Sequence, residues 1–227
     1  IPHLSGLRFR LRMPLVWWAV RSSFPYAVVV FLMYLYTYVD AVMIERMLPN
    51  GAREAGIYAS GYRLLDAVCI VGYLFAGLLL PMFSRLLGRG EAVQPLVEMS
   101  GRALWSVAVV VSVTTFWFGE ELSDLLYRHA DARWGQVLSW LMLSFLPWSI
   151  TYIYGTLLTA AGNLWPMNRL FLVCIALNVG ANLYVIPRYG APGAALTTLL
   201  TQSVAAGGQY LLALRYFPRL RNSRLLL

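Results

Sequence analysis

The feature that most limits the fold of this chain is a series of long apolar segments joined by short polar connections. The segments lie at about 23–44, 56–83, 102–119, 135–160, 166–186 and 191–217. Several reach the roughly 20 residues that a helix needs to cross a bilayer. We therefore expect an all-α integral membrane protein, a bundle of six transmembrane helices. Strands are not expected, because an open sheet edge cannot face lipid.

Charge is scarce and mostly positive. Only 12% of the residues are charged, 59% are hydrophobic, and the formal net charge is +8. Soluble domains carry roughly twice that charged fraction. All 18 basic residues are arginines, and they cluster at the ends of the apolar segments. This placement favours a role in membrane topology over nucleic-acid binding, and we expect no nucleic-acid partner.

The arginines predict the orientation of the bundle. The segment 1–22 forms an arginine-rich arm and 218–227 a basic tail. Twelve arginines fall on the side of the two termini and five on the opposite side; the twelve are Arg8, Arg10, Arg12, Arg21, Arg85, Arg89, Arg102, Arg169, Arg215, Arg219, Arg221 and Arg224. Because cytoplasmic loops are enriched in arginine, both termini are predicted to be cytoplasmic.

Three ionisable residues lie within the first two apolar segments. Asp40 precedes the turn around Pro49 by about the same depth as Arg63 follows it, and Asp66 lies one helical turn further on. Such residues usually face a bundle interior or water. Two interpretations remain open: a salt bridge that joins two helices, or a cavity that contacts an anionic headgroup, protons or ions. Asp40, Arg63 and Asp66 are therefore candidate substrate or cavity residues.

Amides provide the other candidates. Asn178 and Asn182 lie one turn apart, and Gln202 falls near the middle of the last segment. Interhelical hydrogen bonding beside small residues is one interpretation, and contact with a sugar or lipid headgroup is the other. Motifs for catalysis, cofactors or metals are absent, apart from His129 within an acidic connection, which we interpret as a surface loop. We expect no enzyme, no metal and no bound cofactor.

Several motifs in order resemble a known family. The series "YVDAVMI", "GAREAGIYASGYRLLDA", "PMFSRL", "LLYR" and "NVGANLYVIPRYGAPGAALTT" is similar to the polysaccharide-exporting flippases. These are members of the multidrug/oligosaccharidyl-lipid/polysaccharide exporter superfamily. Their fold has two six-helix lobes around a central cavity. The resemblance covers about 24–216, and it implies that this chain corresponds to the C-terminal lobe.

The resemblance implies a function that remains to be tested. The lobe would help to move a lipid-linked oligosaccharide from the cytoplasmic to the periplasmic leaflet of the bacterial inner membrane, by alternating access. Its partners would be that cargo, membrane lipids, and an N-terminal lobe or a second copy of the chain. Arg63 would bind phosphate, and Asp40 and Asp66 would hold Arg63 or couple transport to H⁺ or Na⁺. Alternatives are a multidrug/cation antiporter, a peptidoglycan-precursor flippase, a membrane-embedded transferase and an assembly subunit.

Overall fold

The described part of the protein is helical. The computed structural model describes residues 13–127 and 131–222, so most of the arginine-rich arm, His129 and the end of the tail lie outside the described residues. The helices are α1 (Met13–Met47), α2 (Gly51–Gly88), α3 (Gln94–Trp117), α4 (Gly119–Leu126), α5 (Ala132–Leu143), α6 (Phe145–Ala160), α7 (Leu164–Tyr216) and the short 3₁₀ helix η1 (Pro218–Asn222). The expectation of an all-α membrane bundle is confirmed.

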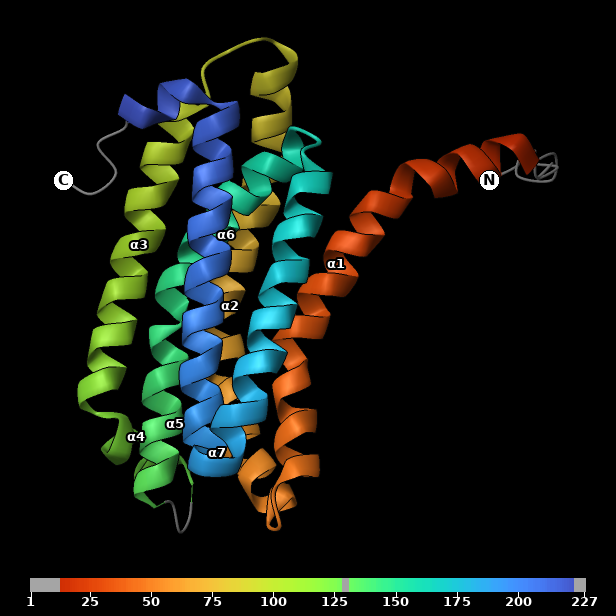
Figure 1. Ribbon diagram of the computed structural model, residues 1–227. Helices are drawn as coiled ribbons and strands as arrows, with labels where there is room; N and C mark the ends of the chain where they lie inside the picture. The colour runs from red at the N-terminus through yellow and green to blue at the C-terminus, as the bar shows by residue number, and fades with distance from the viewer. Residues whose placement is uncertain (1–12, 128–130, 223–227) are drawn as a thin grey trace, which may run out of the picture.

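Five described segments are long and apolar enough to span a membrane, and the longest one contains two helices. The backbone of α7 leaves helical geometry at Gly190, with φ 62° and ψ −145°. Figure 1 shows the two halves of α7 running side by side in opposite directions from this point. The described residues therefore make six helical passages. Helix α1 begins at Met13, ten residues before the start expected from the sequence.

The segment formed by α5 and α6 is the centre of the bundle. In its apolar stretch 78% of the residues are buried, against 22–39% in the other spans. Helix α6 packs against α2, α3 and α7, and α5 packs against α2, α3, α4 and α7. The two helices are separated at Ser144, three residues before Pro147, which has no N–H for the helical ladder. Helix α1 packs mainly on α7, and its N-terminal part leans away from the bundle (Figure 1).

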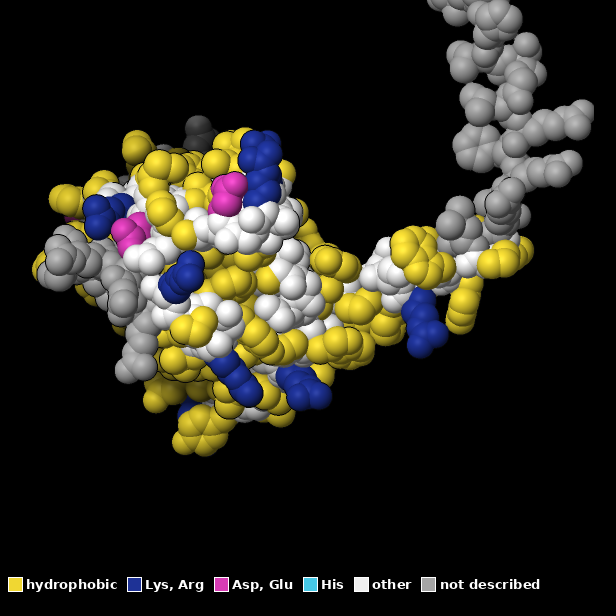
Figure 2. All heavy atoms as spheres, turned by 90° about the horizontal axis from the view of Figure 1, so that it is seen from above, with side chains coloured by type: hydrophobic (Ala, Val, Ile, Leu, Met, Phe, Trp, Pro, Cys, Tyr) yellow, Lys and Arg dark blue, Asp and Glu magenta, His cyan; other side chains and the backbone are white. Residues whose placement is uncertain are grey.

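The two ends of the bundle differ in charge. At the end where α3 begins and α7 finishes, described arginines outnumber the two acidic residues, Glu91 and Glu98; the arginines include Arg85, Arg89, Arg102, Arg169, Arg215 and Arg219. Figure 2 shows arginine side chains spread over this end. The opposite end has four described arginines and six acidic residues. We refer to the first as the basic end.

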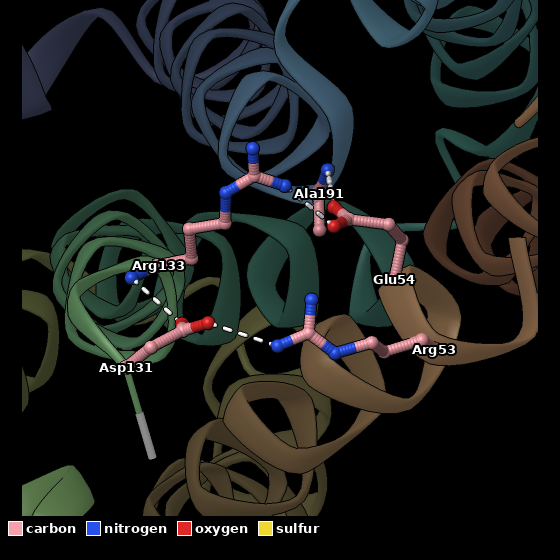
Figure 3. A network of polar contacts seen from close by, with 5 residues as sticks. All are labelled: Arg53, Glu54, Asp131, Arg133 and Ala191. Atoms are coloured by element: carbon pink, nitrogen blue, oxygen red, sulfur yellow. Dashed lines mark hydrogen bonds and ion pairs between the residues drawn. The ribbon is translucent and has the colours of Figure 1, made fainter. Parts of the chain in front are cut away.

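A polar network fixes the opposite end (Figure 3). Glu54, near the start of α2, accepts a hydrogen bond from the Ala191 backbone N–H at 3.0 Å and one from Arg133 Nη1 at 2.7 Å. Asp131 accepts the backbone N–H of Arg133 and pairs with Arg53 at 2.9 Å. One buried carboxylate thus caps the second half of α7 and also joins it to α2 and α5.

The bend at Gly190 leads to a stability prediction. A left-handed backbone with this ψ is a region that essentially only glycine occupies. A methyl group added there would also lie 2.7 Å from Glu54 Oε2. We expect Gly190→Ala to lower the free energy of unfolding by about 1–3 kcal/mol, measured by thermal or denaturant unfolding in detergent. Gly180→Ala is the matched control, because a methyl group there meets nothing within 4 Å; equal stability of both variants would contradict the prediction.

Candidate transport site

Asp40 of α1 lies where its helix meets three others, α2 and the two halves of α7. Its side chain is 0% exposed, although it is a carboxylate within a membrane span. From the second half of α7, Thr198 Oγ1 donates to Asp40 Oδ2 at 2.6 Å, and from the first half, Asn182 Nδ2 donates to Oδ1 at 2.8 Å. The Tyr58 hydroxyl from α2 donates at 2.9 Å. The carboxylate therefore connects α1 with α2 and with both halves of α7.

The same junction is rich in oxygen atoms. Asn182 Nδ2 lies 3.3 Å from Asn178 Oδ1. Asn182 Oδ1 is buried and has no hydrogen-bond partner within the described residues. Thr198 Oγ1 lies 3.0 Å from the Ala194 carbonyl oxygen and 2.9 Å from the Tyr58 hydroxyl. A carboxylate, two amide oxygens, a hydroxyl and a backbone carbonyl are ligands that a hard cation prefers.

The three ionisable residues of the first helical hairpin do not meet, although they were expected at a similar depth in the membrane. Asp40 is buried, whereas Arg63 and Asp66 are both exposed. Ion pairs among the described residues join Arg53 to Asp131, Arg89 to Glu91 and Arg133 to Glu54. A salt bridge between Arg63 and either aspartate is not among them. The interpretation of these residues as a salt bridge that joins two helices is therefore wrong.

The physical reason is the angular position of each residue around α2. Tyr58 points at Asp40. Arg63 follows Tyr58 by five residues, and at 3.6 residues per turn this places it roughly 140° away around the helix. Counting depth along two helices estimates height, but not the direction in which a side chain points. The role of Arg63 and Asp66 in contacting cargo stays a prediction.

Asp66 lies at the edge of an aromatic pocket between α1, α2 and α6. The pocket is lined by Tyr38, Tyr62, Cys69 and Tyr152 among others. Gly72 allows the Tyr152 ring to approach α2, because any side chain at Gly72 would collide with that ring. Such a surface offers flat apolar faces and hydroxyl groups together.

A larger cleft of about 360 Å³ shares Tyr73, Trp148 and Tyr152 with this pocket and extends toward α7. Its lining includes Trp148, Thr151 and Gln209. The Trp148 indole N–H, the Thr151 hydroxyl and both polar atoms of the Gln209 amide are buried without a hydrogen-bond partner among the described residues. Buried polar groups are rarely left in this state. The cleft between α1, α2, α6 and α7 therefore has unused hydrogen-bonding capacity.

The structure separates the predicted residues into three sets. Asp40, Asn178 and Asn182 meet at one junction, Gln202 is buried one helical turn after Thr198 on α7, and Arg63 and Asp66 lie at the surface. Sequence reasoning missed Tyr58 and Trp148. Tyr58 was detectable in principle, since it lies on α2 near the depth of Asp40. Trp148 resembled any aromatic residue of a buried helix, and no local pattern distinguishes it.

Comparison with known proteins supports the family resemblance. Residues 9–87 match the family described as polysaccharide biosynthesis protein. The resemblance to polysaccharide exporters is thereby confirmed. The match covers 79 of the 227 residues and includes the Asp40 and Tyr58 positions as well as Arg63 and Asp66. A search of curated proteins finds no match to this chain.

The Asp40 junction leads to a paired prediction on α7. Thr198→Val removes a hydrogen bond to a buried carboxylate, and such bonds to charged groups contribute about 1.5–3 kcal/mol. Thr197→Val is the control, because among the described residues the Thr197 hydroxyl bonds only to the Gly193 carbonyl of its own helix, at 3.1 Å. We expect the Thr198 variant to be less stable than the Thr197 variant by at least about 1 kcal/mol, measured by thermal unfolding in detergent. Indistinguishable unfolding curves would argue against the Asp40 contact.

Proposed function

We propose that this chain is one lobe of a transporter that flips a lipid-linked oligosaccharide from the cytoplasmic to the periplasmic leaflet. A sugar-pyrophosphate headgroup cannot cross hydrocarbon unaided, because burying polar and charged groups without partners is very costly. The observation that carries the proposal is the cleft between α1, α2, α6 and α7. It holds buried hydrogen-bonding groups that have no partner among the described residues, inside a mostly apolar bundle.

The chemistry of the cleft suits a carbohydrate. Sugars present hydroxyl groups at their edges and apolar C–H faces, and they bind where hydrogen-bonding groups adjoin aromatic rings. The Tyr73 and Tyr152 rings pack edge to face at 5.2 Å, and the Trp148 ring stacks on Tyr152 at 5.5 Å. Unused donors and acceptors on Trp148, Thr151 and Gln209 lie within the same cleft. Arg63, exposed on α2, would supply a guanidinium for phosphate oxygens.

The rest of the transporter would cover the exposed face of α1 and α2. Large apolar side chains on α1 are exposed, among them Phe31, Tyr34 and Tyr38. In the proposed arrangement an N-terminal lobe or a second copy of the chain faces this surface, and alternating access opens the space between them. The basic end would face the cytoplasm of a bacterial inner membrane, in accordance with the bias of arginines toward that side.

The Asp40 junction is the proposed site of ion coupling. In the described conformation Asn182 presents its amide N–H₂ to Asp40. A 180° rotation of that side-chain amide would instead present Oδ1 to the junction. A cation could then be held by the oxygens of Asp40, Asn178, Asn182 and Thr198. Binding would replace hydrogen bonds that hold α1 against α7. Sodium suits such an oxygen site, and a proton on Asp40 is the alternative.

A multidrug/cation antiporter is the second candidate. The exposed carboxylate of Asp66 at the edge of an aromatic pocket favours it, because organic cations bind between acidic groups and aromatic rings. The family match to polysaccharide biosynthesis proteins favours the flippase. A membrane-embedded transferase has no comparable support from the described residues.

The cargo role of Arg63 is tested in cells that make the surface polysaccharide. We expect Arg63→Ala in the natural gene to reduce surface polysaccharide at least about tenfold, because a pyrophosphate loses its guanidinium partner. The amount of protein in the membrane should not change. Arg46→Ala, which removes another exposed arginine, is the control. Normal polysaccharide in the Arg63 variant would contradict the role, and loss of drug export with intact polysaccharide would favour the antiporter.

Ion coupling is tested on the purified chain. At tenfold its Kd, sodium that binds only the folded state adds about 1.4 kcal/mol, or roughly 3–5 °C in the melting temperature. We expect this shift between sodium chloride and choline chloride for the wild type and for Asp66→Asn, but not for Asp40→Asn. No sodium effect on the wild type would contradict sodium binding. A pH-dependent shift that Asp40→Asn abolishes would assign the role to a proton.

A further inference from the structure

A separate groove lies between α3, α6 and α7. Its volume is about 230 Å³, and it shares no lining residue with the cleft described above. Gly101 and Trp105 of α3 form one wall, Gly207 and Tyr210 of α7 form the other, and α6 forms the floor through Ile153 and its neighbours. The groove exceeds the roughly 150 Å³ of an apolar cavity that accepts benzene. A methyl group added at Gly207 would meet nothing within 4 Å, so the α7 backbone borders open space.

The depth of the groove follows from the helix ends. Gly101 lies seven residues after the start of α3, and Tyr210 lies six residues before the end of α7. Tyr154 lies six residues before the end of α6. At 1.5 Å per residue, all three positions are about 9–11 Å from the basic end. In a bilayer this is close to the boundary between the lipid headgroups and the hydrocarbon.

One polar atom in this apolar groove is unsatisfied. The Tyr154 side chain lines the groove and is only 4% exposed. Its ring packs edge to face against Tyr210 at 5.1 Å. Its hydroxyl has no hydrogen-bond partner within the described residues. A buried donor without a partner is destabilising, and a purely hydrocarbon ligand would not supply the missing acceptor. A ligand for this groove should therefore be mostly apolar and carry a hydrogen-bond acceptor near one end.

The charges nearby indicate the headgroup. Arg102 follows Gly101 directly, and Arg215 lies in the last turn of α7, about one and a half turns beyond Tyr210. Both are exposed, and Figure 2 shows the arginine-rich surface at this end. The nearest acidic residue on α3, Glu98, accepts a hydrogen bond from Gln94 at 2.8 Å. By the same count Arg102 lies about 12 Å and Arg215 about 2 Å from the basic end. Long arginine side chains at either position can extend to the headgroup region, where they attract anionic phosphates.

We propose that the groove binds one acyl chain of an anionic glycerophospholipid. The chain lies along α6, an ester carbonyl accepts the hydrogen bond of Tyr154, and the phosphate faces Arg102 and Arg215. This site lies outside the cleft and does not depend on the proposed cargo. The bound lipid would fill the space between α3 and the end of α7 and would stay with the protein instead of exchanging freely with the surrounding bilayer.

Photolabelling tests the site on the complete chain in vesicles of phosphatidylglycerol. A trace of phosphatidylglycerol with a diazirine on one acyl chain is activated by light, and labelled peptides are mapped by mass spectrometry. We expect labelling at 101–105, 149–154 and 207–210. Gly207→Leu should fill the groove and lower this labelling at least fivefold. Gly180→Leu is the matched control, because it adds the same side chain into open space outside the groove.

Two further measurements keep the test decisive if the Gly207 variant folds poorly. In the wild type, unlabelled phosphatidylglycerol should compete with the label in the groove in a saturable way, and Tyr154→Phe should reduce labelling severalfold. Labelling that does not saturate, or that is unchanged in a folded Gly207→Leu chain, would overturn the site. Equal labelling by a phosphatidylcholine probe would overturn the preference for an anionic lipid.

Discussion

The arrangement of this bundle depends on one buried carboxylate. A charge in the interior of a membrane protein requires partners, and Asp40 finds them on every helix segment that surrounds it. Tyr58 donates from α2, Asn182 from the first half of α7, and Thr198 from the second half. Three separate stretches of chain are thus held in place by hydrogen bonds to one carboxylate. The same arrangement makes the junction sensitive to any proton or cation that competes for the carboxylate oxygens.

The sequence predicted the class of fold well, because the length and composition of apolar segments depend on the bilayer rather than on detailed packing. It also found Asp40, Asn178 and Asn182 as candidates, since polar groups in apolar surroundings stand out. It did not predict which of them meet. Depth alone grouped Asp40 with Arg63, whereas the structure groups it with Asn182 and Thr198. When a helix is apolar on almost every face, the hydrophobic pattern of the sequence does not indicate the direction in which a given side chain points.

The two ends of the bundle are stabilised in different ways. Away from the basic end, Glu54 and Asp131 join α2, α5 and the bend at Gly190 through short polar contacts. Toward the basic end, α3 and α7 border a groove, and α1 leans away from its neighbours. In the proposed transport cycle the end held by Glu54 and Asp131 would stay fixed, while the helices near the basic end would change their spacing.

The lean of α1 has a consequence for the way in which a large amphiphile could enter. Tyr26 and Val30 of α1 form one side of the cleft, and Trp148 and Phe171 form part of the other. A slot bounded by a diverging helix is open sideways as well as lengthwise. A molecule with a polar head and a long hydrocarbon tail would not have to be extracted from the bilayer. Its head could slide in from the side while its tail stayed among the lipids.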